Sequence, residues 1–570
     1  MPGGSGAAVA AAVEQGSTPV VTAKGSSLRV DWASGSLSDG SPVDGYVVQR
    51  YDADTLSSQP PLSACAGTLA ALTCTEDDVP EGHWVYSVTP TVATNWRGPE
   101  SRMSNSVRVD ATPPVNDLTL SGISGDAVKS GDTVYYRGVA GGSFSLTNAV
   151  GDSGSGPASS TTADLTGTSR GWEHAPSTVS TPSGGPFVSA PFTWRPGASG
   201  AVNEVVTGSD ALDNTTSTNL SFVDDSDGPS GGAVTVTGLV GTGLAYAPSA
   251  SVSLVLDQGT DQNGPATTGN LLNRASAPLT SDGTSDGTCG SFGTSTTVAG
   301  GTDPASSMVD TVADQSCYRY EYVVLDDLGN ATTYTSGDVK VDLTGPGAPT
   351  RSFADLSNTY WSAIPARLYY RSTASSGSFT VSASATDPES GVASYTFPTA
   401  AQIGTNWVAS SAEPDERTYS WTSTPTGSTA RSITATNHAT RASTPSATFI
   451  PTADNTAPTV GSVSYLNGAT TSSTVDVSFT SGTDTGAGLA AKALERASAP
   501  MTNGLCGTFS SFTTLATNPT SPYVDATLAM DTCYKYEYET PDNVGNQRSN
   551  TSASIVKVSG DVTGPTGGSA

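Results

Sequence analysis

Carboxylate side chains that could bind calcium recur in turns and at the places where repeated segments of the chain join. Calcium takes oxygen ligands from carboxylates, backbone carbonyls and amides. Residues 224–228 do not meet the full spacing of an EF-hand loop. Asp and Asn also suit turns because their side chains bond to nearby backbone groups, and this alternative stays open. The candidate calcium ligands are Asp224, Asp225, Asp227, Asp326, Asp327 and Asp342.

Residues 151–156 read Gly-Asp-Ser-Gly-Ser-Gly, which is similar to the nucleophile loop of chymotrypsin-like proteases. That chemistry needs a general-base His and an orienting Asp, both placed by the fold. A second copy of the segment aligns Asp387 and Ser390 with Asp152 and Ser155 but lacks the motif. We therefore interpret residues 151–156 as a loop between strands, and predict no catalytic residue, no enzymatic activity and no cofactor other than calcium. The three histidines lie in turns or loops or beside a strand, at His83, His174 and His438.

Tyrosine occupies alternate positions in residues 318–322 and 534–538. A period of two places these side chains on one face of a strand. A binding platform for sugar is one interpretation, but a row of Tyr alternating with charged residues is more typical of a core face with a polar exterior.

An arginine recurs at one place in three of the repeated segments, as Arg50, Arg274 and Arg496. We expect each to pair across strands with a carboxylate on the outer face, such as Glu321 or Glu537.

Six cysteines fall in three local pairs, and an even count confined to separate segments fits disulfides made in an oxidising compartment. No Cys-x-x-Cys or Cys/His cluster supplies the four close ligands of a zinc site. The predicted disulfides are Cys65–Cys74, Cys289–Cys317 and Cys506–Cys533. We accordingly expect an extracellular or cell-surface location.

The 570 residues carry a formal charge of −28 and are too many for one hydrophobic core. This charge argues against nucleic-acid binding, which needs clustered Lys and Arg, and against attachment to an anionic membrane surface. No apolar run is long enough to insert into a membrane. We expect the chain to be a piece of a longer exported protein with flanking domains, with a cytoplasmic or virion protein as the alternative.

Two types of segment alternate along the chain. Type A carries the cysteines, and its last two copies share the phrase Arg-Ala-Ser-Ala-Pro at residues 274–278 and 496–500. Type B shares Tyr-Tyr-Arg at residues 135–137 and 369–371. The predicted repeats, in the order A-B-A-B-A, are 17–110, 111–228, 229–344, 345–457 and 458–563, with a flexible segment at 1–16 and a tail at 564–570.

Each repeat holds several short alternating strands with turn signals between them, which indicates immunoglobulin-type β-sandwiches. Together with the Gly-Thr-Asp loops at 259–261 and 482–484, these phrases resemble fibronectin type III or bacterial immunoglobulin-like repeats of large secreted actinobacterial surface proteins. The resemblance implies an all-β fold of five tandem sandwiches in an elongated array.

Such repeats mostly space or display other parts of a protein. The expected function is therefore a non-enzymatic extracellular spacer or stalk, with cell-wall, glycan or protein ligands as partners. The alternatives are a carbohydrate- or protein-binding adhesin module and an accessory region of a larger secreted hydrolase. An exposed aromatic cluster would favour an adhesin, and the side chains to inspect are Trp96, Trp361 and Trp407.

Overall fold

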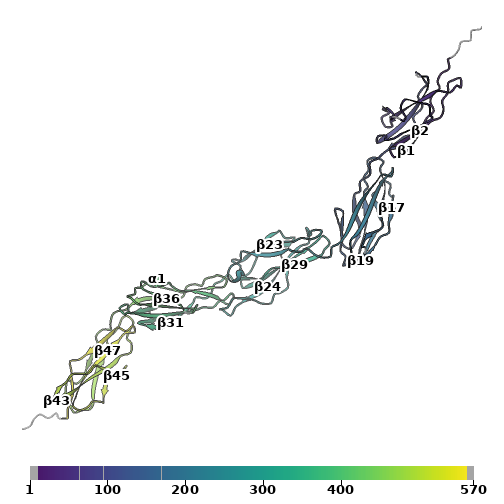
Figure 1. Cartoon of the computed structure of the whole chain (residues 1–570). Helices are drawn as coiled ribbons and strands as arrows, with labels where there is room; N and C mark the ends of the chain where they lie inside the picture. Colours follow the sequence, from purple (N-terminus) through teal and green to yellow (C-terminus); the bar gives the residue numbers. More distant parts are fainter. Residues whose placement is uncertain (1–9, 63, 94, 169, 412, 561–570) are drawn as a thin grey trace, which may run out of the picture. The chain divides into compact units, whose positions relative to one another are not determined.

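The computed structural model describes residues 10–560 apart from 63, 94, 169 and 412, and its regular secondary structure is almost entirely β-strand (Figure 1). The α-helix among these residues, α1, is a single turn at Ala400–Ile403, where the Thr399 hydroxyl accepts a hydrogen bond from the Gln402 backbone N–H. The chain forms two compact units. The first contains residues 10–233, 257–271 and 323–334, and the second contains residues 234–256, 272–322 and 335–560.

In the first unit, residues 20–109 form two sheets, with the orders β1-β2-β6 and β4-β3-β7-β8. Their strands are β1 (Val20–Lys24), β2 (Ser27–Asp31), β3 (Gly45–Asp52), β4 (Ser58–Gln59), β5 (Thr68–Leu69), β6 (Thr73–Glu76), β7 (Gly82–Val92), β8 (Trp96–Arg97) and β9 (Val107–Val109). Alternate side chains of β2 point into the core. Leu28 and Val30 belong to the same buried cluster as Tyr46 of β3, so each sheet supplies one side of the core. Val13, within the predicted N-terminal segment, forms a bridge with Leu37 and is 6% exposed.

Residues 118–224 form the next two sheets, with the orders β10-β13-β19-β16 and β11-β12-β21-β20-β14-β17. Their strands are β10 (Leu118–Ser124), β11 (Ala127–Ser130), β12 (Thr133–Tyr136), β13 (Gly142–Asn148), β14 (Pro157–Thr162), β15 (Thr166–Gly167), β16 (Arg170–Glu173), β17 (Ser177–Val179), β18 (Phe187–Val188), β19 (Phe192–Ser199), β20 (Val202–Asp210) and β21 (Thr215–Asp224). Phe144 of the first sheet packs edge-to-face on Phe222 of the second, with ring centroids 5.6 Å apart. This aromatic core closes the sandwich.

The chain continues through β22 (Ala233–Thr237), a 3-10 turn η1 (Thr242–Leu244), β23 (Ser251–Asp257), β24 (Leu271–Thr280), β25 (Thr288–Cys289), β26 (Thr296–Thr302), β27 (Ser307–Thr311), β28 (Ser316–Leu325), β29 (Ala331–Thr335) and β30 (Val339–Val341). In the second unit, β22, β23 and β27 form one sheet, and β24 and β28 belong to another. The tyrosine stripe of β28 faces inward, since Tyr318, Tyr320 and Tyr322 are all buried.

The rest of the second unit contains two further stretches of strands, and among the described residues the first forms three sheets and the second forms two. Residues 350–453 contain β31 (Thr350–Ser357), β32 (Thr359–Ser362), β33 (Arg367–Tyr370), β34 (Gly377–Ser384), β35 (Val392–Thr396), β36 (Val408–Ser410), β37 (Glu416–Trp421), β38 (Thr434–Asn437) and β39 (Ile450–Ala453). Residues 462–558 contain β40 (Ser462–Ser464), β41 (Gly468–Thr470), β42 (Val475–Thr480), β43 (Ala493–Thr502), β44 (Leu505–Cys506), β45 (Thr513–Thr517), β46 (Tyr523–Asp525), β47 (Thr532–Pro541), β48 (Gln547–Thr551) and β49 (Val556–Val558). Each stretch has its own buried cluster, one around Phe379 and Trp421 and one around Val477 and Tyr536.

The three predicted disulfides are present. Cys289 of β25 joins Cys317 near the start of β28, Cys506 of β44 joins Cys533 near the start of β47, and a tighter loop links Cys65 with Cys74. Separate buried cores between β-sheets, one after another along the sequence, confirm an all-β fold of tandem immunoglobulin-type sandwiches. The boundaries between the repeats remain a prediction.

The recurring arginines have partners other than those predicted. Arg274 reaches across the sandwich to Asp310 of β27, with Nη1 and Oδ2 2.6 Å apart, and not to Glu321 on the outer face. Arg496 likewise pairs with Asp525 of β46 and not with Glu537. Facing sheets bring these residues together, with the carboxylates buried and the arginine side chains partly exposed. Cross-strand spacing within one sheet cannot reveal this relationship.

Candidate functional site

Carboxylates from separate loops meet at four places in the described part of the chain. Within each group, one ligand oxygen per residue lies within 4.8 Å of the others. The groups are Asp110 with Asp152 and Asp210, Asp225 with Asp261 and Asp326, Asp342 with Asp387 and Glu389, and Asp454 with Asp484 and Asp542. We name each cluster by its first residue, which in every case comes just before a predicted repeat boundary.

The first carboxylate of a cluster is positioned by the strand that precedes it. In the stretch ending at Asp225, β21 pairs in parallel with β12, and the Asp225 N–H continues this pairing by donating to the Tyr136 carbonyl at 2.9 Å. Asp454 follows β39 and donates to the Tyr370 carbonyl at the same distance. The pairing at the end of the preceding strand thus fixes the backbone of the first carboxylate residue of the cluster.

Another carboxylate comes from a tight turn of the form Asp-x-x-x-Asn. The Asp326 N–H donates to the Asn330 carbonyl at 3.0 Å, and the Asn330 N–H donates back to Asp326 Oδ1 at 2.8 Å. Asn330 Nδ2 then donates to Asp326 Oδ2 at 2.7 Å and to the Asp225 carbonyl at 2.9 Å. The turn is therefore tied to the joint that precedes it.

The remaining carboxylate lies in a glycine-rich loop, and in the Asp110 cluster that loop is the Gly-Asp-Ser-Gly-Ser-Gly stretch at residues 151–156. Asp152 Oδ2 accepts from the Gly156 N–H at 2.5 Å, and the Ser155 N–H donates to Asp110. A Cβ on Gly154 would come within 2.1 Å of Asp110 Oδ2, so a larger residue here would displace this carboxylate. These contacts support the interpretation of the motif as a structural loop.

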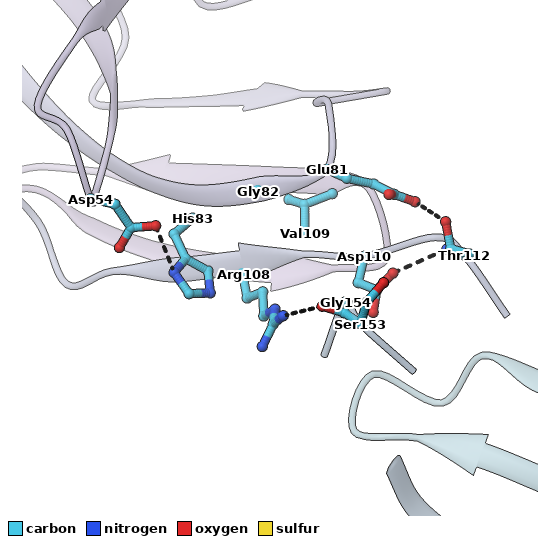
Figure 2. Close-up of a pocket in the computed structure, with 10 residues that line it drawn as sticks. All are labelled: Asp54, Glu81, Gly82, His83, Arg108, Val109, Asp110, Thr112, Ser153 and Gly154. Atoms are coloured by element: carbon cyan, nitrogen blue, oxygen red, sulfur yellow. Dashed lines mark hydrogen bonds and ion pairs between the residues drawn. The ribbon is translucent and has the colours of Figure 1, made fainter. Parts of the chain in front are cut away.

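A pocket of about 340 Å³ lies beside this loop, and Figure 2 shows the side chains that line it. His83, which sequence analysis did not connect with the loop, lines the same pocket as Ser153. His83 Nδ1 lies 3.4 Å from Asp54 Oδ2, while the contact to Ser153 comes from Arg108, whose Nη2 donates to the Ser153 carbonyl at 3.4 Å. Among the described residues no hydrogen bond joins His83 to Ser153, so the general-base contact of a serine protease is not formed.

Electrostatics distinguish the Asp225 cluster from the others. Asp225 is 1% exposed, and burial, followed by the nearby Asp261 and Asp326 carboxylates, raises the pKa of its carboxyl to about 7. In the other clusters, both oxygens of Asp110 and of Asp454 accept backbone N–H groups.

The Asp342 cluster departs from the common pattern because Asn437 stands where the other clusters have the turn aspartate. Its Nδ2 donates to Asp342 Oδ2 at 2.9 Å and to Asp387 Oδ2 at 3.0 Å. The protein's own amide thus lies between two buried carboxylates.

Three of the six predicted calcium ligands lie in these clusters, but the structure brings only two of them together. Asp225 and Asp326 share one cluster, and Asp342 belongs to another. Asp224 Oδ1 instead accepts hydrogen bonds from Gly138 and Ser226. The remaining two predicted ligands are exposed and belong to none of the clusters found in the described residues, namely Asp227 and Asp327.

The loop carboxylates were missed, although a signal for them existed in the sequence. Asp261 and Asp484 each end a Gly-Thr-Asp phrase that recurs at the same place in two repeats. Recurrence at a fixed place near a joint was the signal that could have identified them.

The tryptophans selected for inspection differ in exposure. Trp407 is buried in a core, and Trp361 is half-buried and stacked on Phe353 with ring centroids 4.4 Å apart. Trp96 is 43% exposed.

No protein-family model and no curated protein matches the chain. Similar solved structures include the FN1-FN3 domains of chicken CNTN1, at 10% identity and a TM-score of 0.23, covering 57% of this chain and 96% of that one. The Protocadherin GammaB4 extracellular domain shows 11% identity and a TM-score of 0.20 over 95% of this chain and 84% of that one. Protocadherin Gamma B2 extracellular cadherin domains 3-6 show 9% identity and a TM-score of 0.20 over 78% and 100%. Values this low support no conclusion about function.

Proposed function

We propose that the chain is a non-enzymatic structural or adhesive repeat region of an extracellular protein, which spaces or displays other parts of that protein. The observation that carries this proposal is the series of separately closed sandwich cores, with three disulfides among them. Disulfides persist in oxidising compartments, which supports an extracellular location. No helix of the described residues has the length and apolar character to cross a membrane.

An adhesin module is the second candidate, and Trp96 is the inspected tryptophan whose ring is most open to a partner, at 43% exposure. Aromatic side chains of this type are enriched where proteins bind partners, since the ring supplies a large apolar surface. The tyrosine stripes of β28 and β47 are not available for this role, because they lie within their cores.

Binding of the full chain to a glycan array and to cell-wall material separates the two candidates. A spacer gives no saturable binding, and Trp96→Ala behaves like the wild type. Saturable binding that Trp96→Ala abolishes would contradict the spacer and support the adhesin.

A serine-directed fluorophosphonate probe tests the non-enzymatic part of the proposal. We expect no labelling of Ser153, because among the described residues no hydrogen bond joins a base to its hydroxyl. Labelling that is lost in Ser153→Ala and in His83→Ala would contradict it.

A further inference from the structure

The Asp225 cluster contains a carboxylate that the polypeptide leaves unsatisfied. Asp225 is almost fully buried, and among the described residues neither of its carboxylate oxygens has a hydrogen-bond donor. An ionised carboxylate buried without a partner is strongly unfavourable. Something beyond the described side chains must therefore balance this group.

The surroundings of Asp225 add to the negative charge. Oxygens of Asp261 and Asp326 lie within 4.8 Å of it and of one another, and within the described chain no Lys or Arg forms an ion pair with any of the three. A proton on Asp225 would remove one charge, but it would leave the other two carboxylates facing each other. A divalent cation would balance the cluster more completely.

We propose that Asp225, Asp261 and Asp326 together bind a calcium ion. Calcium–oxygen distances are about 2.3–2.6 Å, so two oxygens on one ion are at most about 5.2 Å apart. The spread of no more than 4.8 Å in this cluster meets that limit. An all-oxygen set of hard ligands suits calcium and not zinc, which prefers nitrogen and sulfur.

Asn330 adds a neutral oxygen beside the same cluster. It is buried and holds Asp225 and Asp326 through Nδ2, while its Oδ1 has no hydrogen-bond partner among the described residues. The amide thus fixes two of the three ligands in place before the ion arrives.

The other clusters need a cation less. Backbone N–H groups already satisfy both oxygens of Asp110 and of Asp454, and the Asn437 amide bridges Asp342 and Asp387. We therefore expect the Asp225 cluster to bind calcium with the highest affinity of the four clusters.

The ligands come from both sides of the repeat boundary predicted at residue 228. An ion shared by Asp225 and the two later residues would couple the successive repeats. This inference does not depend on whether the protein is a spacer or an adhesin.

Calorimetric titration of the EDTA-treated full chain with CaCl₂ tests the proposal. We expect Asp225→Asn to lose the tightest binding event and Asp227→Asn, an exposed neighbour outside the cluster, to retain it. Absence of calcium binding in the wild type, or an unchanged titration of Asp225→Asn, would overturn the proposal. A response of equal strength to MgCl₂ would overturn the assignment to calcium.

Thermal unfolding of the same variants distinguishes a ligand role from a structural one. In EDTA, Asp225→Asn should melt at or above the wild-type temperature because it removes a buried charge, and CaCl₂ should raise the melting temperature of the wild type alone. Loss of calcium binding together with a lower melting temperature in EDTA would contradict the proposal, since Asp225 would then have a partner within the fold.

Discussion

The side-chain amide of Asn330 donates a hydrogen bond of 2.9 Å to the backbone carbonyl of Asp225, 105 positions earlier in the chain. The same amide closes its own turn through Asp326. Two other asparagines, Asn214 and Asn546, make the same pair of bonds at their own joints. One side chain thus connects a turn of each such repeat to the joint that leads into it.

Asn330→Ala should lower the free energy of unfolding of its repeat by about 2 kcal/mol, because it leaves buried acceptors without donors. Urea unfolding of the full chain measures this change. Asn219→Ala, at an exposed position of β21, is the matched control and should have a small effect. Equal effects of the two substitutions would contradict the role assigned to Asn330.

The overall fold could be predicted because its signals are local. Alternating residues such as Leu28 and Val30 mark a strand with one buried face, and the three cysteine pairs lie close in sequence. The partners of Arg274 and Arg496 could not be predicted, because Asp310 and Asp525 lie on the facing sheet. Which strands face each other depends on the packing of two sheets, and no single segment carries that information.

Asp525→Ala should destabilise the last repeat by about 1.5–3 kcal/mol, the usual contribution of a hydrogen bond to a charged group, because the carboxylate is buried while the Arg496 side chain is 24% exposed. Asp525 accepts from Arg496 Nη1 at 2.8 Å and from the Tyr536 hydroxyl at 2.6 Å. Thermal unfolding measures the loss. Asp476→Ala, exposed on β42, is the control, and an equally small effect of both changes would show that the pair is dispensable.

Removal of the disulfides should destabilise the repeats in an order set by loop length. The Cys289–Cys317 bridge spans 28 residues and should contribute about 3–4 kcal/mol, whereas the Cys65–Cys74 bridge spans 9 and should contribute about 2–3 kcal/mol. Denaturant unfolding of the paired Cys→Ser variants measures both contributions. A larger loss at the shorter loop would contradict this order.

Glu204 should make the second predicted repeat less stable as the pH rises. Its side chain is fully buried with one oxygen unpartnered, and burial raises its pKa to about 7. Between about pH 4.5 and pH 7 the unfolded chain releases this proton while the folded chain retains it, so stability falls.

Glu204→Gln should therefore exceed the wild type in stability by about 3 kcal/mol at pH 8, and the difference should vanish near pH 4. Urea unfolding at the two pH values measures the difference. Asp132→Asn, at an exposed position of the same repeat, is the control. A constant difference between Glu204→Gln and the wild type at both values would rule out titration of Glu204 as its cause.

The candidate site could be predicted only in part. Composition and turn chemistry predicted Asp225 and Asp326 as ligands. The same signals also predicted Asp227, which is exposed. Asp261 and Asp326 are brought to Asp225 by the loops of the following repeat. Their meeting depends on how one repeat is joined to the next, which neither segment shows by itself.

We conclude that the chain is a series of separately closed sandwiches. Single-molecule force extension tests it most directly, because independent cores unfold one at a time. We predict a series of separate unfolding events. A reductant should increase the length of chain that is released when a disulfide-containing repeat unfolds. A single event that releases the whole chain, with no effect of reductant, would contradict the account.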